Sequence, residues 1–152
     1  MSESFTTSVR IEAPPQDVFG YLVDAEQIVR WMGEWADLDP TPGGRLAVDV
    51  LGVPVRGEFL VVEPPHRVVF TWGAAGSDAL PPGSTTVEIR LRADGDATVL
   101  ELAHRDLPPT ELDQHHIGWD HFLARLAAAG TGADPGPDPW ATTGPQAGPV
   151  SH

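Results

Sequence analysis

The chain contains no cysteine and no lysine among its 152 residues, and these two absences exclude several kinds of chemistry. Without cysteine there is no disulfide, thiolate metal site, iron–sulfur cluster or cysteine nucleophile. Without lysine there is no Schiff base and no phosphate-binding P-loop. All nine basic residues are therefore arginines.

Positive charge is scarce, because nine basic residues stand against 22 acidic ones, for a formal net charge of −13. Such a chain repels the phosphates of nucleic acids and anionic lipid headgroups, so we expect neither nucleic acid nor a membrane as a partner. No apolar run approaches the roughly 20 residues that span a bilayer. The N-terminal residues also lack the basic and apolar segments of a secretory signal, so we expect a cytoplasmic protein.

Length and composition predict one folded domain over residues 1–129, followed by a tail. A domain of this size buries about 68–70% of the surface of its unfolded chain, which is enough for a substantial core. From residue 130 onward, 23 residues include five glycines and five prolines with no apolar period. This composition predicts a disordered tail over 130–152, although Trp140 within it could dock on the domain.

Apolar periodicity predicts the element order β-α-α-β-β-β-β-β-α. A short strand and two short helices come first, with Asp24 and Gln27 resembling a capping pair for the second helix. A long helix closes the domain over 110–129, with Thr110 and Asp113 as cap partners. The expected strands cover 7–12, 45–50, 55–63, 67–72, 85–92 and 98–104.

The same periodicity assigns faces to these elements. Successive residues of a helix are about 100° apart, which places one side of the last helix against the sheet and His121 opposite. That side carries Leu112, His115, His116, Trp119, Phe122, Leu123 and Leu126. Alternation along the strands gives the inward faces, with Val55, Gly57, Phe59 and Val61 as the uniformly apolar choice on 55–63. The other inward residues are Val68, Phe70, Trp72, Val87, Ile89, Leu91, Leu100, Leu102 and His104.

The order of these elements resembles the SRPBCC superfamily (START/Bet v 1-like), and in particular its AHSA1-like members. The matching segments, from Thr7 to about Ala128, are Val9–Phe19, Arg30–Met32, Gly43–Arg45, Gly57–Glu58, Pro64–Trp72, and His115 with Gly118–Trp119. The resemblance implies an α+β helix-grip fold, in which an antiparallel sheet of about six strands curves around the C-terminal helix. It also implies a hydrophobic cavity between the sheet and that helix.

The resemblance implies that a small hydrophobic molecule, lipid-like or aromatic and polyketide-like, binds in this cavity. We expect no cofactor. The superfamily also contains enzymes, so a cyclase, dehydratase or lyase acting on a polyketide-like substrate is the first alternative. A co-chaperone-like interaction module is the second, and an exposed sheet edge could support a homodimer. The expected lining residues are Trp31, Met32, Val48, Val50, Phe59, Phe70, Trp72, His104, His115, Trp119 and Phe122.

The candidates for proton transfer are His104, His115 and His116, with Glu58 in reserve. We expect His104 to be a hydrogen-bonded structural group before it is a ligand contact. His115 and His116 diverge by about 100° on a helix, so at most one points squarely inward. A metal site would need three or four converging ligands, which His115, His116, Asp120 and His121 do not provide, so we expect none.

Overall fold

The computed structural model describes residues 3–132 and 135. The strands are β1 (Glu3–Ile11), β2 (Trp35–Leu38), β3 (Arg45–Val50), β4 (Val53–Glu63), β5 (Arg67–Trp72), β6 (Thr85–Asp94) and β7 (Ala97–Leu107). The helices are α1 (Pro15–Val23), α2 (Ala25–Ile28), the 3-10 turn η1 (Pro109–Glu111) and α3 (Leu112–Gly130). Most of the predicted tail, including Trp140, lies outside the described residues.

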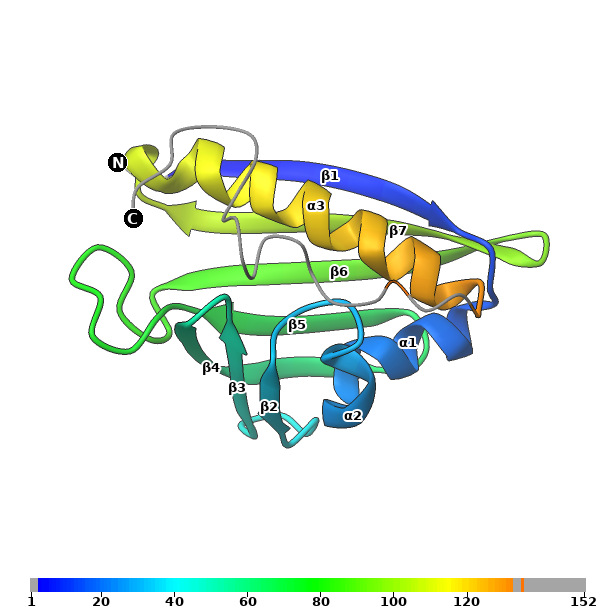
Figure 1. The fold of residues 1–152 in the computed structure, drawn as a ribbon, viewed down its shortest axis with the longest axis horizontal. Coiled ribbons are helices and arrows are strands. Elements are labelled where there is room, and N and C mark those ends of the chain that lie inside the picture. Colours follow the sequence, from blue (N-terminus) through cyan, green and yellow to red (C-terminus); the bar gives the residue numbers. More distant parts are fainter. Residues whose placement is uncertain (1–2, 133–134, 136–152) are drawn as a thin grey trace.

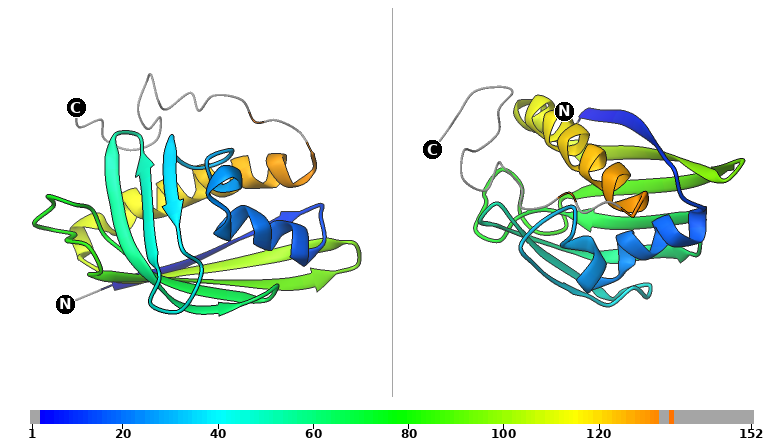
Figure 2. Two further views of the ribbon diagram at one scale, coloured as in Figure 1. Left: turned by 90° about the horizontal axis from the view of Figure 1, so that it is seen from below. Right: turned by 45° about the vertical axis from the view of Figure 1, so that its right-hand side comes forward.

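All seven strands form one antiparallel sheet in the order β1-β7-β6-β5-β4-β3-β2. Helix α3 runs along β1 and β7, and α1 and α2 lie beside it on the same side of the sheet (Figure 1). The sheet curves strongly, so that β2 and β3 rise on the side that carries the helices (Figure 2). The predicted α+β helix-grip fold is confirmed.

The core fills the space between the inner face of the sheet and the helices. Alternation brings Val87, Ile89 and Leu91 of β6 inward, all at most 4% exposed. Helix α3 buries one side of its surface in the same core, because its apolar residues recur at intervals of three and four positions. Its buried residues are Trp119, Phe122, Leu123, Leu126 and Ala129.

Strand β2 is an element that the sequence pattern did not predict, so the sheet has seven strands rather than about six. It comprises only Trp35, Ala36, Asp37 and Leu38, too few residues to show a period of two. It pairs with β3 at the edge of the sheet, and Trp35 is 48% exposed. Tertiary pairing with β3, rather than a local pattern, therefore creates this strand.

A bulge in β4 corrects the predicted face of that strand. Phe59 pairs with Phe70 and Val61 pairs with Val69, which leaves Leu60 as the extra residue. The predicted inward face holds through Phe59 and then changes register. Val62, and not Val61 as predicted, packs against the core.

The start of the long helix also differs from its prediction. Pro109–Glu111 form a 3-10 turn, and α3 begins at Leu112 after Glu111, which makes no capping bond through its side chain. Thr110 is exposed within this turn, so the predicted cap by Thr110 and Asp113 is wrong. The predicted capping role of Asp24 is confirmed, because its side chain accepts a hydrogen bond from the Glu26 amide.

Candidate functional site

His104 of β7 is the centre of the site between the sheet and α3. It follows Leu100 and Leu102 at a spacing of two, so the strand turns it inward, and it is completely buried. Its Nε2 lies 2.8 Å from the Thr85 hydroxyl oxygen of β6. The Trp119 indole N–H of α3 donates to its Nδ1 at 3.0 Å. One imidazole therefore joins two strands and the covering helix.

These partners determine the tautomer of His104. An indole N–H can only donate, so Nδ1 of His104 must accept and the ring proton must sit on Nε2. The Nε2–H then donates to Thr85, whose hydroxyl donates in turn to the Trp72 carbonyl oxygen at 2.7 Å. Both ring nitrogens are satisfied within the protein. We conclude that His104 fills the structural role expected for it.

Burial and, to a smaller extent, the neighbouring His115 lower the pKa of His104 to about 3. Protonation would also place a second N–H at Nδ1, facing the Trp119 donor. The ring therefore stays neutral at physiological pH. A group with this pKa and two occupied nitrogens is poorly suited to proton transfer.

Aromatic rings from three elements surround His104. Trp72 of β5 packs edge-on at 6.0 Å between ring centroids, and His115 of α3 does so at 5.2 Å. Trp72 and Trp119 contact each other at 5.0 Å. The Phe5 ring of β1 lies 5.9 Å from the His104 ring between centroids. The structure thus brings the predicted residues Trp72, His104, His115 and Trp119 into one cluster.

His115 differs from His104 in its hydrogen bonding. Its Nδ1 lies 2.9 Å from the Glu111 carbonyl oxygen, an acceptor, so Nδ1 carries the proton and Nε2 keeps its lone pair. The Glu111 carboxylate is 3.9 Å from Nδ1, which is beyond hydrogen-bond distance. Burial lowers the pKa of His115, and this outweighs the raising effects of the Glu111 backbone bond and carboxylate. His115 therefore presents a neutral acceptor.

The predicted apolar lining residues all belong to one buried cluster. They come from α3, from three strands and from the segment after α2, and each is at most 8% exposed. These residues are Trp31, Met32, Val48, Val50, Phe59, Phe70, Trp72, Trp119 and Phe122. The residues predicted to line the cavity therefore lie together in one part of the fold.

The other two proton-transfer candidates are exposed, and one of them contacts the edge of this cluster. Glu58 is exposed on β4. His116 is also exposed, with its Nε2 3.6 Å from Asp120 and its ring stacked on Phe5 at 4.7 Å. As expected, only one of the two neighbouring histidines turns toward His104.

Two site residues were missed by the sequence analysis. Thr85 shares the alternation of Val87, Ile89 and Leu91, so extending that face by one position would have placed it inward. Phe5 was missed because the first strand was begun at Thr7, whereas β1 begins at Glu3. Neither omission concerned an unusual local structure.

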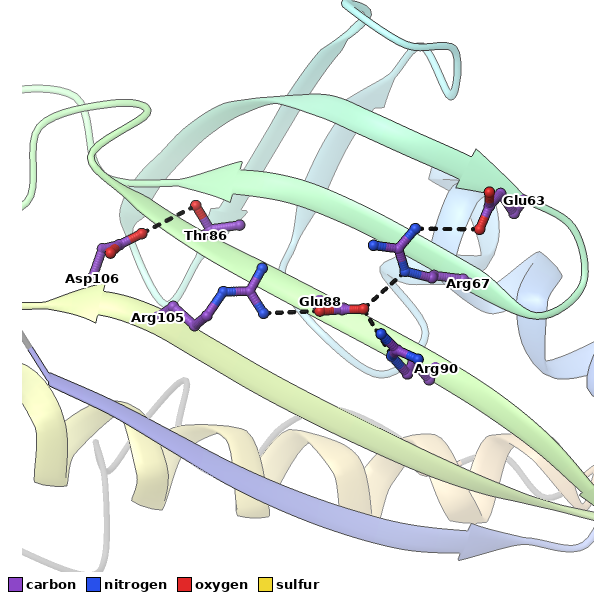
Figure 3. A network of polar contacts seen from close by, with 7 residues as sticks. All are labelled: Glu63, Arg67, Thr86, Glu88, Arg90, Arg105 and Asp106. Carbon is purple, nitrogen blue, oxygen red and sulfur yellow. Dashed lines mark hydrogen bonds and ion pairs between the residues drawn. The ribbon is translucent and has the colours of Figure 1, made fainter.

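The opposite face of the sheet carries a network of charges centred on Glu88 (Figure 3). Its carboxylate accepts hydrogen bonds from Arg67, Arg90 and Arg105, each at 2.8 Å. Arg67 in particular, together with Arg105 and Arg90, holds the pKa of Glu88 at about 2 against the raising effect of its burial. A shallow hollow beside the network is lined by Thr6, Thr7, Ser8, Glu88, Arg90, Glu101, Leu102 and Ala103. The ion pairs of Glu88 join β5, β6 and β7.

Replacing Glu88 with glutamine is expected to destabilise the fold by about 1–2 kcal/mol at neutral pH, because three guanidinium groups would lose their shared anion. Urea unfolding measures this loss. Glu101→Gln is the matched control, since it removes the same charge from an exposed residue of the neighbouring strand. Equal stability of the two variants would show that the network contributes nothing.

Neither a metal site nor a membrane-spanning helix is found in the part of the chain that the structure describes. Within residues 3–132 and 135, no three His, Asp or Glu side chains are placed to hold a metal ion. No helix over the same residues has the length and apolar character needed to cross a bilayer.

Comparison with known proteins places the chain among relatives of the same fold. The model of the Activator of Hsp90 ATPase homolog 1-like family matches residues 12–130. The AHSA1-like protein of Rhizobium etli is 40% identical, with a TM-score of 0.74 over 100% of this chain and 93% of that one. CalU16 of Micromonospora echinospora is 32% identical, with a TM-score of 0.75 over 91% and 71%.

DynU16, a protein in the dynemicin biosynthetic locus, is 26% identical, with a TM-score of 0.75 over 87% of this chain and 49% of that one. An Hsp90 activator of Plasmodium falciparum is 24% identical with a TM-score of 0.71 and shows the fold alone. No curated protein matches the sequence. The family model covers most of the chain, and the chain belongs to the Activator of Hsp90 ATPase homolog 1-like family.

Proposed function

We propose that the protein binds a small hydrophobic molecule, aromatic or lipid-like, between the curved sheet and α3. The observation that carries the proposal is the gathering of apolar and aromatic side chains between the sheet and α3. Val50, Trp72 and Phe122, each 7–8% exposed, belong to one core cluster with Phe59, Leu100 and Leu126, which are completely buried. Apolar surface of this kind is where a hydrophobic ligand gains free energy by displacing water.

The relatives support a small molecule from a biosynthetic setting. DynU16 is a protein of the dynemicin biosynthetic locus, and this chain shares its fold at 26% identity. A protein-interaction module would instead call for an exposed apolar patch. Among the described residues, the exposed large hydrophobic side chains are Trp35, Val53 and Leu60. Leu60 lies seven positions beyond Val53 on β4, so the three do not form one patch.

Binding is favoured over catalysis because the histidines at the site are poor proton carriers. Both nitrogens of His104 are occupied. The depressed pKa of His115 makes it a weak base, and among the described residues no carboxylate lies within hydrogen-bond distance of it. We therefore place cyclase, dehydratase or lyase chemistry second.

The proposal is tested by native mass spectrometry on the purified protein, followed by a thermal-shift screen of fatty acids, sterols, flavonoids and polyketide aromatics. We expect a co-purified mass or a melting temperature that rises with concentration. A ligand at a hundred times its Kd adds about 2.7 kcal/mol to the stability of the folded state. If no molecule co-purifies and no compound shifts the melting temperature, small-molecule binding is contradicted.

A cytoplasmic homodimer completes the proposal on partners and location. Among the residues that the structure describes, the two edges of the sheet are β1 and β2, and the edge strand β2 carries the exposed Trp35. Light scattering after size-exclusion chromatography is expected to give twice the 16.2 kDa mass of one chain. The mass of a single chain at micromolar concentration would contradict the dimer.

A further inference from the structure

The polar groups on the inner side of the fold are almost all paired with one another. The Trp31 indole N–H donates to the Tyr21 carbonyl oxygen at 2.9 Å, and the Tyr21 hydroxyl donates to the Ala129 carbonyl oxygen at 3.1 Å. The Thr98 hydroxyl donates to the Ala13 carbonyl oxygen at 2.7 Å. His104, Thr85 and Trp119 satisfy each other as described above. Any inward polar atom without a partner is therefore an exception.

Two such atoms remain at the site: the indole N–H of Trp72 and the Nε2 of His115. Within residues 3–132 and 135, neither has a hydrogen-bond partner. Every completely buried side-chain nitrogen or oxygen among these residues does have one. Both atoms must therefore be within reach of solvent, although Trp72 is only 8% exposed and the His115 side chain only 18%.

The two atoms belong to rings that flank the same imidazole. Trp72 and His115 each pack edge-on against His104, from β5 and from α3 respectively. His104 itself is fixed by hydrogen bonds with Thr85 and Trp119, and Thr85 is fixed in turn by the Trp72 carbonyl oxygen, so the rings around His104 have a rigid support. The site therefore offers one unused donor and one unused acceptor on opposite layers of the fold, amid aromatic surface.

The chemistry of this pair selects a hydroxyl group. Trp72 can only donate, and neutral His115 can only accept at Nε2 because its proton is held at Nδ1 by Glu111. A hydroxyl both donates and accepts, so it can satisfy both atoms at once. A carboxylate would accept from Trp72 but meet the lone pair of His115, and an ether or ketone has no proton to donate.

We propose that Trp72 and His115 form a recognition site for a hydroxyl group on an aromatic ligand. The indole N–H of Trp72 donates to the hydroxyl oxygen, and the hydroxyl donates to Nε2 of His115. The neutral state of His115, kept by burial, preserves the acceptor at physiological pH. This inference rests on the proposed binding of an aromatic molecule beside α3 and specifies which aromatic molecules are preferred.

The test compares naphthol with methylnaphthalene, two probes of nearly equal shape in which a methyl group replaces the hydroxyl. A purely apolar site prefers the methyl compound, because burying a hydroxyl without partners costs free energy. The recognition site reverses this order, and we expect naphthol to bind about tenfold more tightly, as one net hydrogen bond provides. Isothermal titration calorimetry on the full chain measures both Kd values.

Two variants locate the effect. Trp72→Phe and His115→Phe each keep an aromatic ring and remove one of the two polar atoms, so each is expected to abolish the tenfold preference while methylnaphthalene still binds. Trp35→Phe is the matched control, because it removes an indole N–H from the exposed edge strand β2, and it should keep the preference.

The outcomes separate this inference from the proposed function. Equal binding of both probes, or tighter binding of methylnaphthalene by the unaltered protein, overturns the hydroxyl site and leaves the apolar pocket standing. A preference that persists in both variants also overturns it. Failure of both probes to bind overturns the pocket and the hydroxyl site together. The unaltered protein gives a result even if a variant does not fold.

Discussion

Replacing Trp119 with alanine is expected to destabilise the fold by about 3–5 kcal/mol, the range measured for large aromatic residues truncated in a core. Trp119 is 3% exposed and packs on Trp72 at 5.0 Å. Its loss leaves a cavity under α3 and removes the donor to His104 Nδ1. Urea unfolding at pH 7 measures the change, with the midpoint compared at constant m-value.

Two further variants separate packing from hydrogen bonding. Trp119→Phe keeps most of the apolar volume and removes the N–H, so it is expected to cost about 1–3 kcal/mol for the unpaired His104 nitrogen. Trp35→Ala removes a tryptophan that is 48% exposed and is expected to change stability by about 0.5 kcal/mol or less. If Trp119→Ala were no more destabilising than Trp35→Ala, the packing of Trp119 against Trp72 would contribute nothing to the stability of the fold.

Stability is expected to fall steeply below pH 6.5, because His104 is neutral in the folded protein and free to take up a proton in the unfolded chain. Its folded pKa of about 3 lies below the ordinary value of 6.5, so the unfolded state binds more protons throughout this interval. For each pH unit of acidification, the titration of His104 therefore lowers the free energy of unfolding by about 1.4 kcal/mol. Two units of acidification cost about 2.7 kcal/mol. The depressed pKa of His115 acts in the same direction.

The range between pH 6.5 and 4.5 isolates this effect from the carboxylates. Glu88 has its folded pKa lowered from 4.5 to about 2, so its contribution is present above pH 4.5 and is lost only below it. His104→Gln is the informative variant, since an amide can accept from Trp119 and donate to Thr85 but does not titrate. The slope of its free energy of unfolding against pH should be smaller than that of the unaltered protein by about 1.4 kcal/mol per pH unit. An unchanged slope would show that His104 is not the titrating group.

Periodicity alone predicted most of what positions the site. The alternation along β7 predicted that Leu100, Leu102 and His104 face inward. The spacing of about 100° per residue along α3 predicted that His115 and Trp119 face the sheet. These predictions succeed because a strand or helix of ten or more residues repeats its geometry, and one buried face fixes the whole element.

The sequence could not predict features that depend on how distant elements meet. The hydrogen bond from Trp119 to His104 depends on where α3 crosses β7, and nothing local encodes that position. The bulge at Leu60 and the strand β2 arise from pairing with neighbouring strands. That the Trp72 indole N–H and the His115 Nε2 have no partner among the described residues is likewise known only once the other hydrogen bonds have been assigned.

The most direct test of ligand binding beside α3 follows the indole N–H signals of the tryptophans by ¹H–¹⁵N NMR while methylnaphthalene is added. Trp→Phe variants assign each signal. The account predicts that the signals of Trp31, Trp72 and Trp119 shift in a saturable manner, while that of the exposed Trp35 stays in place. Saturable shifts at Trp35 alone, or no shift at the three inward tryptophans, would contradict it.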